Sequence, residues 1–182
     1  GVTICGENRV QEMTAHLDDD AYAGAALHFI GHLQTNKVRQ VVGRVELIES
    51  VGSEHLLEAI EAQAAKLELV QDILLEVNIG GEASKSGISP EELSALAAQA
   101  VGSPHVRLRG LMAIPPVAAG PDGNRPFFTK MRQLYVDIRS QMDDNKTSFD
   151  CLSMGMSGDF EDAVREGATL ERQSKLVLLS SI

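Results

Sequence analysis

The sequence predicts an α/β fold of the (β/α)-barrel type, because short β-rich runs alternate with longer amphipathic segments almost to the end of its 182 residues. Strands joined by helices run parallel with right-handed crossovers. Several runs, such as Ile73–Val77, are largely apolar along their length, which is typical of a sheet covered on both faces. Polar clusters also follow the runs, and barrels of this type build their sites at the strand ends. These clusters stand at Asn8, Gly31, Asn78, Pro115 and Gly155.

Seven runs are the candidate strands, which is one fewer than a complete barrel contains. They are Val2–Cys5, His28–Ile30, Val45–Glu49, Ile73–Val77, Val106–Ala113, Asp150–Met154 and Leu176–Leu179. The chain is also shorter than the roughly 250 residues of a typical barrel. We therefore expect an incomplete barrel. Its open sheet edges would be templates for self-association.

Four segments between these runs have the spacing of helices with one buried face. They are Glu54–Leu67, Glu91–Val101, Phe127–Met142 and the short acidic Asp159–Glu166. Ser89 and Pro90 suit the beginning of the second helix as cap and first helical residue. Pro115–Pro126 is the one loop-rich tract, and it reads either as a lid or as a solvated connection.

Composition excludes several classes of function. The formal net charge is −10 and the isoelectric point about 4.9, so nucleic acid and anionic membrane surfaces are repelled. No run approaches the ~20 apolar residues of a membrane span. Cys5 and Cys151 are isolated, which argues against a disulfide framework or a zinc site and favours a reducing compartment. We expect a cytoplasmic protein. Since Gly1 is not an initiator Met, we also expect a single barrel domain, 1–182, that is truncated at its N-terminus, and truncation at its C-terminus stays open.

Three side chains at the strand ends are candidates for binding. Asn8 follows the first run, where its amide can hydrogen-bond a flat ring or a phosphate, or can equally form a turn or helix cap. Lys85 lies in a glycine-rich stretch and offers a cation for phosphate, or is a solvated loop lysine. His28 enters an apolar run, where a hydrogen-bonded structural role is commoner than that of a base.

The segment from Ser153 to Asp159 carries the clearest chemistry. Its serine hydroxyls, its glycine N–H groups and a following helix converge as an anionic phosphate requires. Ser153, Gly155 and Ser157 are the candidate phosphate ligands. Asp159, Glu161 and Asp162 compete for the same positive end, so any binding is expected to be weak. Arg172, taken alone, is an ordinary surface arginine.

Five ordered segments resemble the pyridoxal-phosphate homeostasis family. They are Gly6–Glu12, His28–Lys37, Asn78–Gly87, Arg109–Pro115 and Leu152–Asp159, with Arg172 beyond them. The resemblance implies a barrel of the alanine racemase N-terminal domain type and a non-catalytic protein of intracellular pyridoxal 5'-phosphate (vitamin B6) homeostasis. It places Ser153, Gly155 and Ser157 on the cofactor phosphate and Arg172 opposite the pyridine nitrogen. It also matches Asn8 and Lys85 to the site.

Two departures from the family pattern bear on activity. The family's cofactor lysine lies on a strand before Gly6, and the sequence begins at Gly1. After Arg172 the family continues Ile-Gly-Thr-Ala-Ile-Phe-Gly, whereas here Gln173 to Leu179 reads Gln-Ser-Lys-Leu-Val-Leu-Leu. We therefore expect no lysine-linked cofactor in this chain. Two alternatives stay open: a racemase-like enzyme with a lysine and a second base, and a defective relative that binds no cofactor.

Overall fold

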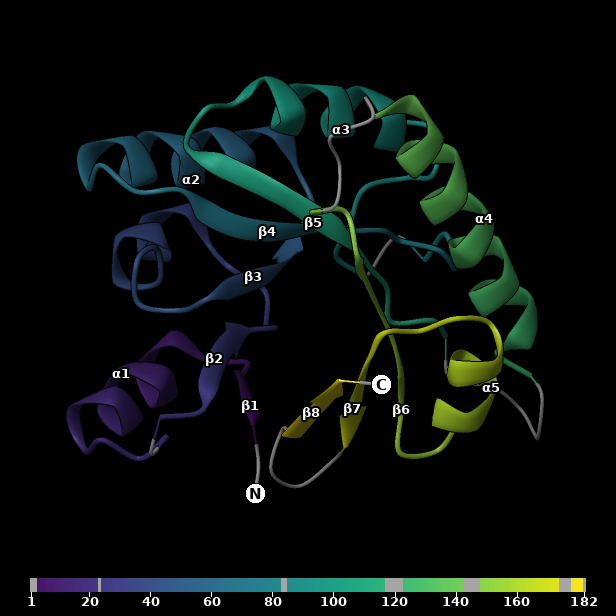
Figure 1. The fold of residues 1–182 in the computed structure, drawn as a ribbon, viewed down its shortest axis with the longest axis horizontal. Coiled ribbons are helices and arrows are strands. Elements are labelled where there is room, and N and C mark those ends of the chain that lie inside the picture. The colour runs from purple at the N-terminus through teal and green to yellow at the C-terminus, as the bar shows by residue number, and fades with distance from the viewer. Residues whose placement is uncertain are drawn as a thin grey trace.

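A computed structural model of the chain describes residues 3–22, 24–82, 85–116, 123–142, 148–173 and 178–181. Helices and strands alternate along most of the chain (Figure 1). In order they are β1 (Ile4–Glu7), α1 (Val10–Asp18), β2 (Ala26–Phe29), the 3-10 helix η1 (Thr35–Gln40), β3 (Leu47–Val51), α2 (Glu54–Lys66), β4 (Gln71–Glu76), α3 (Leu93–Gly102), β5 (Val106–Met112), α4 (Arg125–Gln141), β6 (Cys151–Met156), α5 (Phe160–Arg165), β7 (Leu170–Gln173) and β8 (Leu178–Ser181).

The strands form one barrel in chain order. β1 to β7 pair in parallel with their neighbours, and β8 pairs antiparallel with both β7 and β1. The predicted barrel type is confirmed, with seven parallel strands instead of the eight of a complete (β/α) barrel. The expected open edges were wrong, because β8 hydrogen-bonds to both end strands of the parallel set. Self-association stays a prediction.

Six predicted strands are present with boundaries shifted by up to two residues, as is usual at strand ends. Of the seventh, Leu178 and Leu179 lie in β8, and 176–177 fall outside the described residues. The sequence missed β7. That strand reads Leu-Glu-Arg-Gln, so no apolar run marks it, and its place is set by pairing with β6, where Met156 aligns with Arg172.

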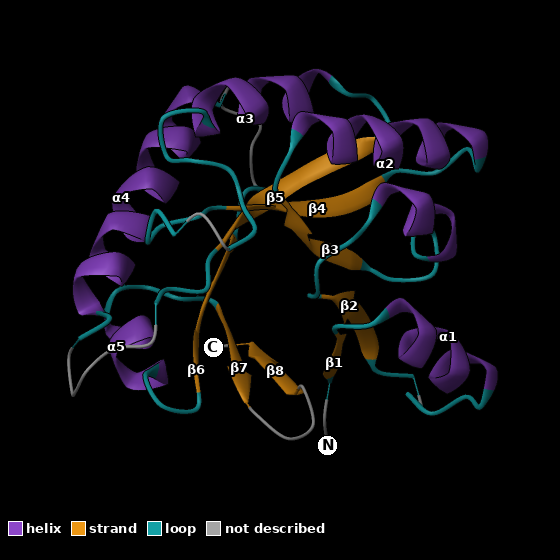
Figure 2. Cartoon of the chain, turned by 180° about the vertical axis from the view of Figure 1, so that it is seen from behind, coloured by secondary structure: helices purple, strands orange, loops and turns teal. Residues whose placement is uncertain are grey.

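Helices cover the outer surface of the sheet, as Figure 2 shows. α2 confirms the predicted helix and turns Leu56, Leu57, Ile60 and Ala64 into the core, and the Ser53 hydroxyl caps it by accepting from the Leu56 N–H at 3.2 Å. α3 begins later than predicted because Ser89 to Glu92 forms a turn. α4 and α5 match their predicted segments closely, with Asp159 and Glu166 flanking α5 as caps.

The inside of the barrel has two layers. Residues two positions apart on a strand point to the same side of a sheet. One is a small apolar cluster of Leu47, Leu74, Met112 and Leu170, with Ile4 and Cys151 against it. Two positions after four of these residues, toward the carboxyl ends of β3, β4, β6 and β7, stand buried polar side chains: Glu49, Glu76, Ser153 and Arg172. The sheet thus carries a polar layer at the end where barrel sites are found.

Gly110 supplies the conformational freedom that the β5–β6 contact needs. Its φ is +155° and a Cβ there would lie 1.7 Å from the backbone oxygen of Cys151. The β4–β5 register also shifts beside it, between Ile73 and Leu74.

We predict that Gly110→Ala lowers the free energy of unfolding by about 2 kcal/mol or more, because backbone strain and a steric clash add. Gly102→Ala is the control, since it ends α3 with no atom within 4 Å of its added Cβ. That change should be neutral or stabilise by about 0.5–1 kcal/mol. Urea unfolding of both variants measures the difference. Equal midpoints would show that Gly110 is not constrained.

Candidate functional site

The predicted site residues gather at one end of the barrel. Because β1 to β7 are parallel, their carboxyl ends share one rim. Asn8 follows β1, Lys85 follows β4, and Ser157 follows β6. The remaining three candidates, Ser153, Gly155 and Arg172, lie on β6 and β7. The expectation that these segments meet at one end is confirmed by the topology.

Arg172 is buried and has a donor to offer. Its side chain is 7% exposed, and its Nε has no hydrogen-bond partner among the described residues. Its Nη2 lies 3.7 Å from the Met112 sulfur, a weak acceptor. Burial lowers the pKa of the guanidinium, and the carboxylates of Glu49 and Glu76 oppose that shift. A buried cation with an unused N–H suits an acceptor atom of a ligand, and the surface role considered for this arginine is excluded.

Glu49 is the centre of the buried polar layer. It has no exposed surface, receives a hydrogen bond of 2.6 Å from the Ser153 hydroxyl, and lies 2.8 Å from His28 Nδ1. These contacts support the structural role expected for His28. The Ser153 hydroxyl is thereby committed to a carboxylate, and its role toward phosphate stays a prediction. The sequence showed Glu49 only as an acid at the end of an apolar run, two positions after Leu47.

The turn after β6 is tightly built. Gly155 has φ +92°, and a Cβ on it would lie 2.5 Å from that of Ala163 on α5. The Met156 N–H donates to Asp159 Oδ1 at 2.7 Å, while Asp159 Oδ2 accepts from Asn124 Nδ2 at 2.5 Å. The Met156 N–H of this turn is therefore already hydrogen-bonded to a carboxylate of the protein itself. The sequence predicts that Asp159 competes with a bound anion, and this hydrogen bond is one way in which it does so.

Asn8 and Gly31 bring the ends of β1 and β2 together. Asn8 is exposed, and a Cβ on Gly31 would lie 2.0 Å from the Asn8 backbone oxygen. Any larger residue at Gly31 would push the Asn8 backbone away from β2.

Lys85 ties two loops at the same rim. Its Nζ lies 2.6 Å from Glu82 Oε2 and donates to the Pro115 carbonyl oxygen at 3.0 Å. Lys85 thus links the loop after β4 to the loop after β5. Half of the loop-rich tract Pro115–Pro126, residues 117–122, lies outside the described residues, so whether it is a lid or a solvated connection stays open.

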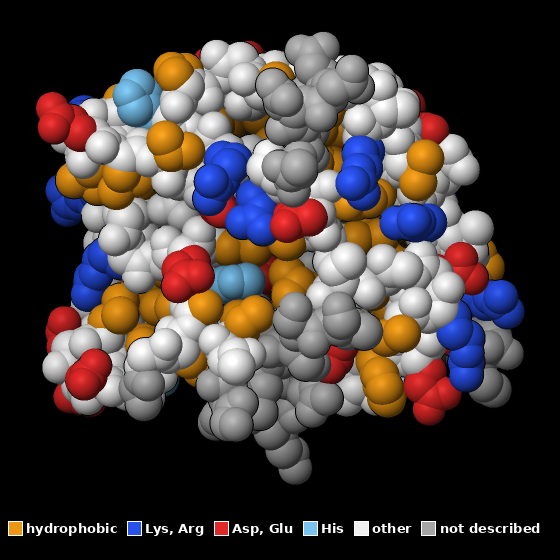
Figure 3. Space-filling view, in the orientation of Figure 1, with side chains coloured by type: hydrophobic (Ala, Val, Ile, Leu, Met, Phe, Trp, Pro, Cys, Tyr) orange, Lys and Arg blue, Asp and Glu red, His pale blue; other side chains and the backbone are white. Residues whose placement is uncertain are grey.

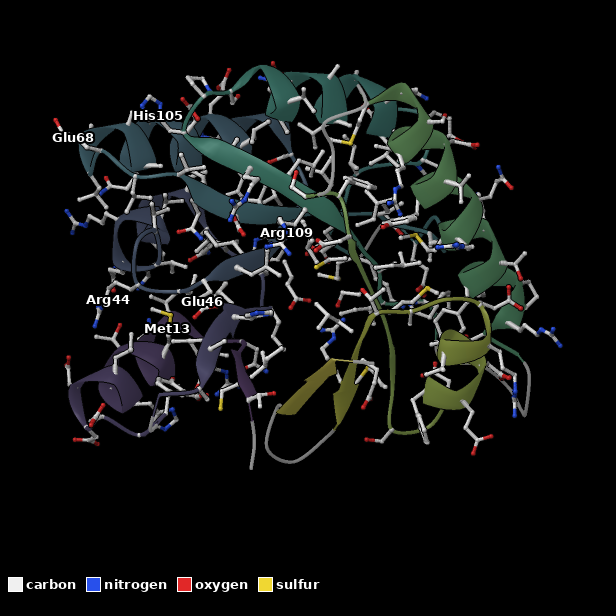
Figure 4. All side chains as sticks on the ribbon, in the orientation of Figure 1. Met13, Arg44, Glu46, Glu68, His105 and Arg109 are labelled. Atoms are coloured by element: carbon white, nitrogen blue, oxygen red, sulfur yellow. The ribbon has the colours of Figure 1, made fainter. Side chains whose placement is uncertain are left out.

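The amino-terminal end of the barrel carries a network of ion pairs. Arg109 pairs with Asp72 at 2.7 Å and with Asp150 at 2.8 Å, and Arg107 also pairs with Asp72. Figure 3 shows basic side chains with acidic ones near the middle of this face, and Figure 4 locates Arg109 there beside β4 and β5. Below them a cavity of about 400 Å³ opens onto the apolar layer. Burial raises the pKa of the Cys151 thiol in its wall to about 12, which keeps that thiol protonated and unreactive.

Cys5 and Cys151 are both free thiols, as expected. Across the described ranges, no three His, Cys, Asp or Glu side chains are grouped so that they could hold a metal ion. In the same part of the chain, no helix has the length and apolar character needed to cross a membrane.

We predict that Ser153→Ala lowers the free energy of unfolding by about 1–3 kcal/mol, because a buried Glu49 oxygen then loses its donor. Ser94→Ala, on the exposed face of α3, is the control and should change stability by no more than about 0.5 kcal/mol. Chemical unfolding compares the two variants. A stability loss as small as that of the control would mean that water or His28 replaces the serine.

The chain is similar to known proteins in both sequence and structure. Residues 1–172 match the family model described as "Alanine racemase, N-terminal domain". The chain is 42% identical to the pyridoxal phosphate homeostasis protein of Aquifex aeolicus, covering 97% of this chain and 76% of that protein, and 37% identical to that of Pseudomonas aeruginosa, covering 94% and 72%. The solved structure of PipY of Synechococcus elongatus, with PLP bound, superposes with a TM-score of 0.80 at 32% identity, covering 92% of this chain and 77% of that one.

Proposed function

This chain belongs to the alanine racemase N-terminal domain family and, within it, to the pyridoxal phosphate homeostasis proteins, and from that premise we propose that it binds pyridoxal 5'-phosphate in a non-catalytic, homeostatic role. The observation that carries the proposal is the buried Arg172 at the carboxyl end of the barrel, whose Nε–H has no hydrogen-bond partner within the described ranges. The pyridine ring of the cofactor has one nitrogen acceptor, which a guanidinium N–H complements.

The residues present fit the ring end of the cofactor. Arg172 would face the pyridine nitrogen, and Glu49 and Glu76 stabilise its charge. When bound, pyridoxal phosphate supplies an electron sink, which is strongest when the ring nitrogen is protonated. A permanently charged guanidinium keeps that nitrogen unprotonated, so it favours holding the cofactor over carbanion chemistry. This supports the non-catalytic half of the proposal.

The phosphate end is proposed to lie at the turn after β6. Gly155 lets the backbone pass close to α5, and Ser157 is an exposed residue in that turn. Asn8, Ser153 and Lys85 are the further candidates at the same rim. Asp159 already accepts the Met156 N–H, so an incoming phosphate has to displace or share that contact. We therefore expect this chain's non-covalent affinity for the cofactor to be millimolar.

Calorimetric titration of the protein with pyridoxal phosphate tests the proposed contact between Arg172 and the pyridine ring. Arg172→Lys keeps the charge near Glu49 and Glu76 but removes the planar donor, so we predict about tenfold weaker binding. Arg139→Lys, on an exposed position of α4, is the matched control and should bind as the unaltered chain does. Equal affinities for both variants would remove Arg172 from the site. Amino-acid racemisation by the cofactor-loaded protein would contradict the non-catalytic role.

A separate prediction concerns the phosphate end. Asp159→Asn keeps an oxygen for the Met156 N–H and removes a negative charge, so phosphate and pyridoxal phosphate should bind about five times more tightly, as expected for roughly 1 kcal/mol of relieved repulsion. Ser157→Ala should bind both ligands more weakly. Calorimetric titration with each ligand measures these changes. Unchanged heats in both variants would place the phosphate away from this turn.

A further inference from the structure

A second cavity opens at the carboxyl ends of β3 and β4. Its volume is about 440 Å³, within the range of small-molecule sites. Ser50 and Glu76 line it from the two strands, and Ser53, Ser86 and Thr35 add hydroxyl groups. None of its lining residues is among the six proposed cofactor contacts. The cavity is therefore formed by other residues of the same rim.

Ser50 contributes a hydroxyl group without a partner. The residue is 3% exposed, and among the described residues no atom hydrogen-bonds to its Oγ. A buried hydroxyl without a hydrogen bond is unfavourable, and most such groups in folded proteins are satisfied. Because Ser50 lines the cavity, a ligand there can supply the missing contact.

Glu76 contributes a carboxylate with little compensation. It is 8% exposed, and within the described ranges no group donates a hydrogen bond to its side chain. Arg172 attracts it, but the same guanidinium also faces Glu49. Two carboxylates therefore share one buried cation, and Glu49 already has Ser153 and His28 as hydrogen-bond partners. The uncompensated negative charge of this layer lies at Glu76, on the cavity wall.

The walls of the cavity are already formed. A Cβ on Gly52 would lie 2.8 Å from Gly87 Cα, so the end of β3 and the loop after β4 are in close contact. That loop is held by the Ile88 N–H, which donates to the Glu76 carbonyl oxygen at 2.8 Å, and by the Asn78 N–H, which donates to the Ile88 carbonyl oxygen at 2.9 Å. Binding here requires little ordering of the backbone, which favours affinity for a small ligand.

From these contacts we infer that the cavity between β3 and β4 is a binding site for a small hydroxylated primary amine, whose ammonium group pairs with Glu76 and whose hydroxyl group hydrogen-bonds to Ser50. An ammonium group has three hydrogen-bond donors and no acceptor, so it complements the Glu76 carboxylate, which receives no hydrogen bond from the described residues. An anion would be repelled by the same carboxylate, and an apolar ligand would leave the Ser50 hydroxyl unsatisfied. Charge and hydrogen bonding thus select the same class of ligand.

Serinol and glycerol are a matched pair of probes, because they differ only in an ammonium or a hydroxyl group on the central carbon. Each is titrated into the ¹⁵N-labelled protein, without pyridoxal phosphate because its aldehyde reacts with amines. Serinol is expected to shift the backbone amide signals around Ser50, Gly52, Glu76 and Gly87 in a saturable way, with glycerol at least about tenfold weaker. Equal shifts from the two probes, or no saturable shift from serinol, would overturn the inference.

Two variants locate the contacts. Glu76→Gln keeps the shape and removes the charge, so serinol binding should weaken about tenfold or more while glycerol is unaffected. Ser50→Ala removes a hydroxyl that has no described partner, so the fold should be retained while serinol binds several-fold more weakly. Glu58→Gln, exposed on α2, is the control for net charge and should leave serinol binding unchanged. Loss of binding in this control, or none in Glu76→Gln, would place the amine elsewhere.

Discussion

The two-residue period of the strands is the constraint on which the site depends. In a closed barrel, every second side chain of a strand points inward, where space is limited and water is largely excluded. Leu47, Leu74 and Leu170 fill one level of that interior. The next inward positions on the same strands carry Glu49, Glu76 and Arg172. The apolar layer thus fixes the strands that present the charged groups, and a shift by one residue would exchange the two faces.

Buried charges have to be compensated, and this layer compensates them unequally. Glu49 has His28 and Ser153 as hydrogen-bond partners and also interacts electrostatically with Arg172. Glu76 has the field of Arg172 but no described donor, and burial raises the pKa of its carboxyl group. A carboxyl whose pKa is raised by folding makes the folded state less stable as the pH rises through that pKa. Glu49 is therefore a structural carboxylate, whereas Glu76 gains most from a ligand.

The local pattern of the sequence was enough for the barrel type, because runs such as Ile73–Val77 and the stripe of α2 record burial directly. It was not enough for β7, whose Leu-Glu-Arg-Gln sequence is a strand only because β6 and β8 pair with it. The roles of Glu49 and Ser50 could not be predicted from the local sequence either. Their environment is set by residues from other strands, as in the contact between Glu49 and Ser153, which are 104 positions apart.

The two ends of the barrel differ in how far their polar groups are satisfied. At the amino-terminal end, Arg107 and Arg109 are paired with Asp72 and Asp150, so the charges of these four side chains are neutralised. At the carboxyl end, the Ser50 hydroxyl and the Arg172 Nε lack partners among the described residues. Unsatisfied buried groups destabilise a fold, so their concentration at one end is typical of a binding site rather than of packing.

The turn after β6 lies at the same end of the barrel, but one of its N–H groups is already bonded to a carboxylate of the protein. Asp159 supplies the anion to its own Met156 N–H, and Asn124 holds the second carboxylate oxygen. The Met156 N–H is consequently satisfied without a ligand, and Gly155 keeps the backbone close to α5. A phosphate gains only the difference between its own hydrogen bonds and those of Asp159, so the turn provides shape more than affinity. Strong retention of a ligand at this rim then depends on the buried polar layer beneath it, where the Arg172 Nε–H has no partner in the part of the chain that the structure describes.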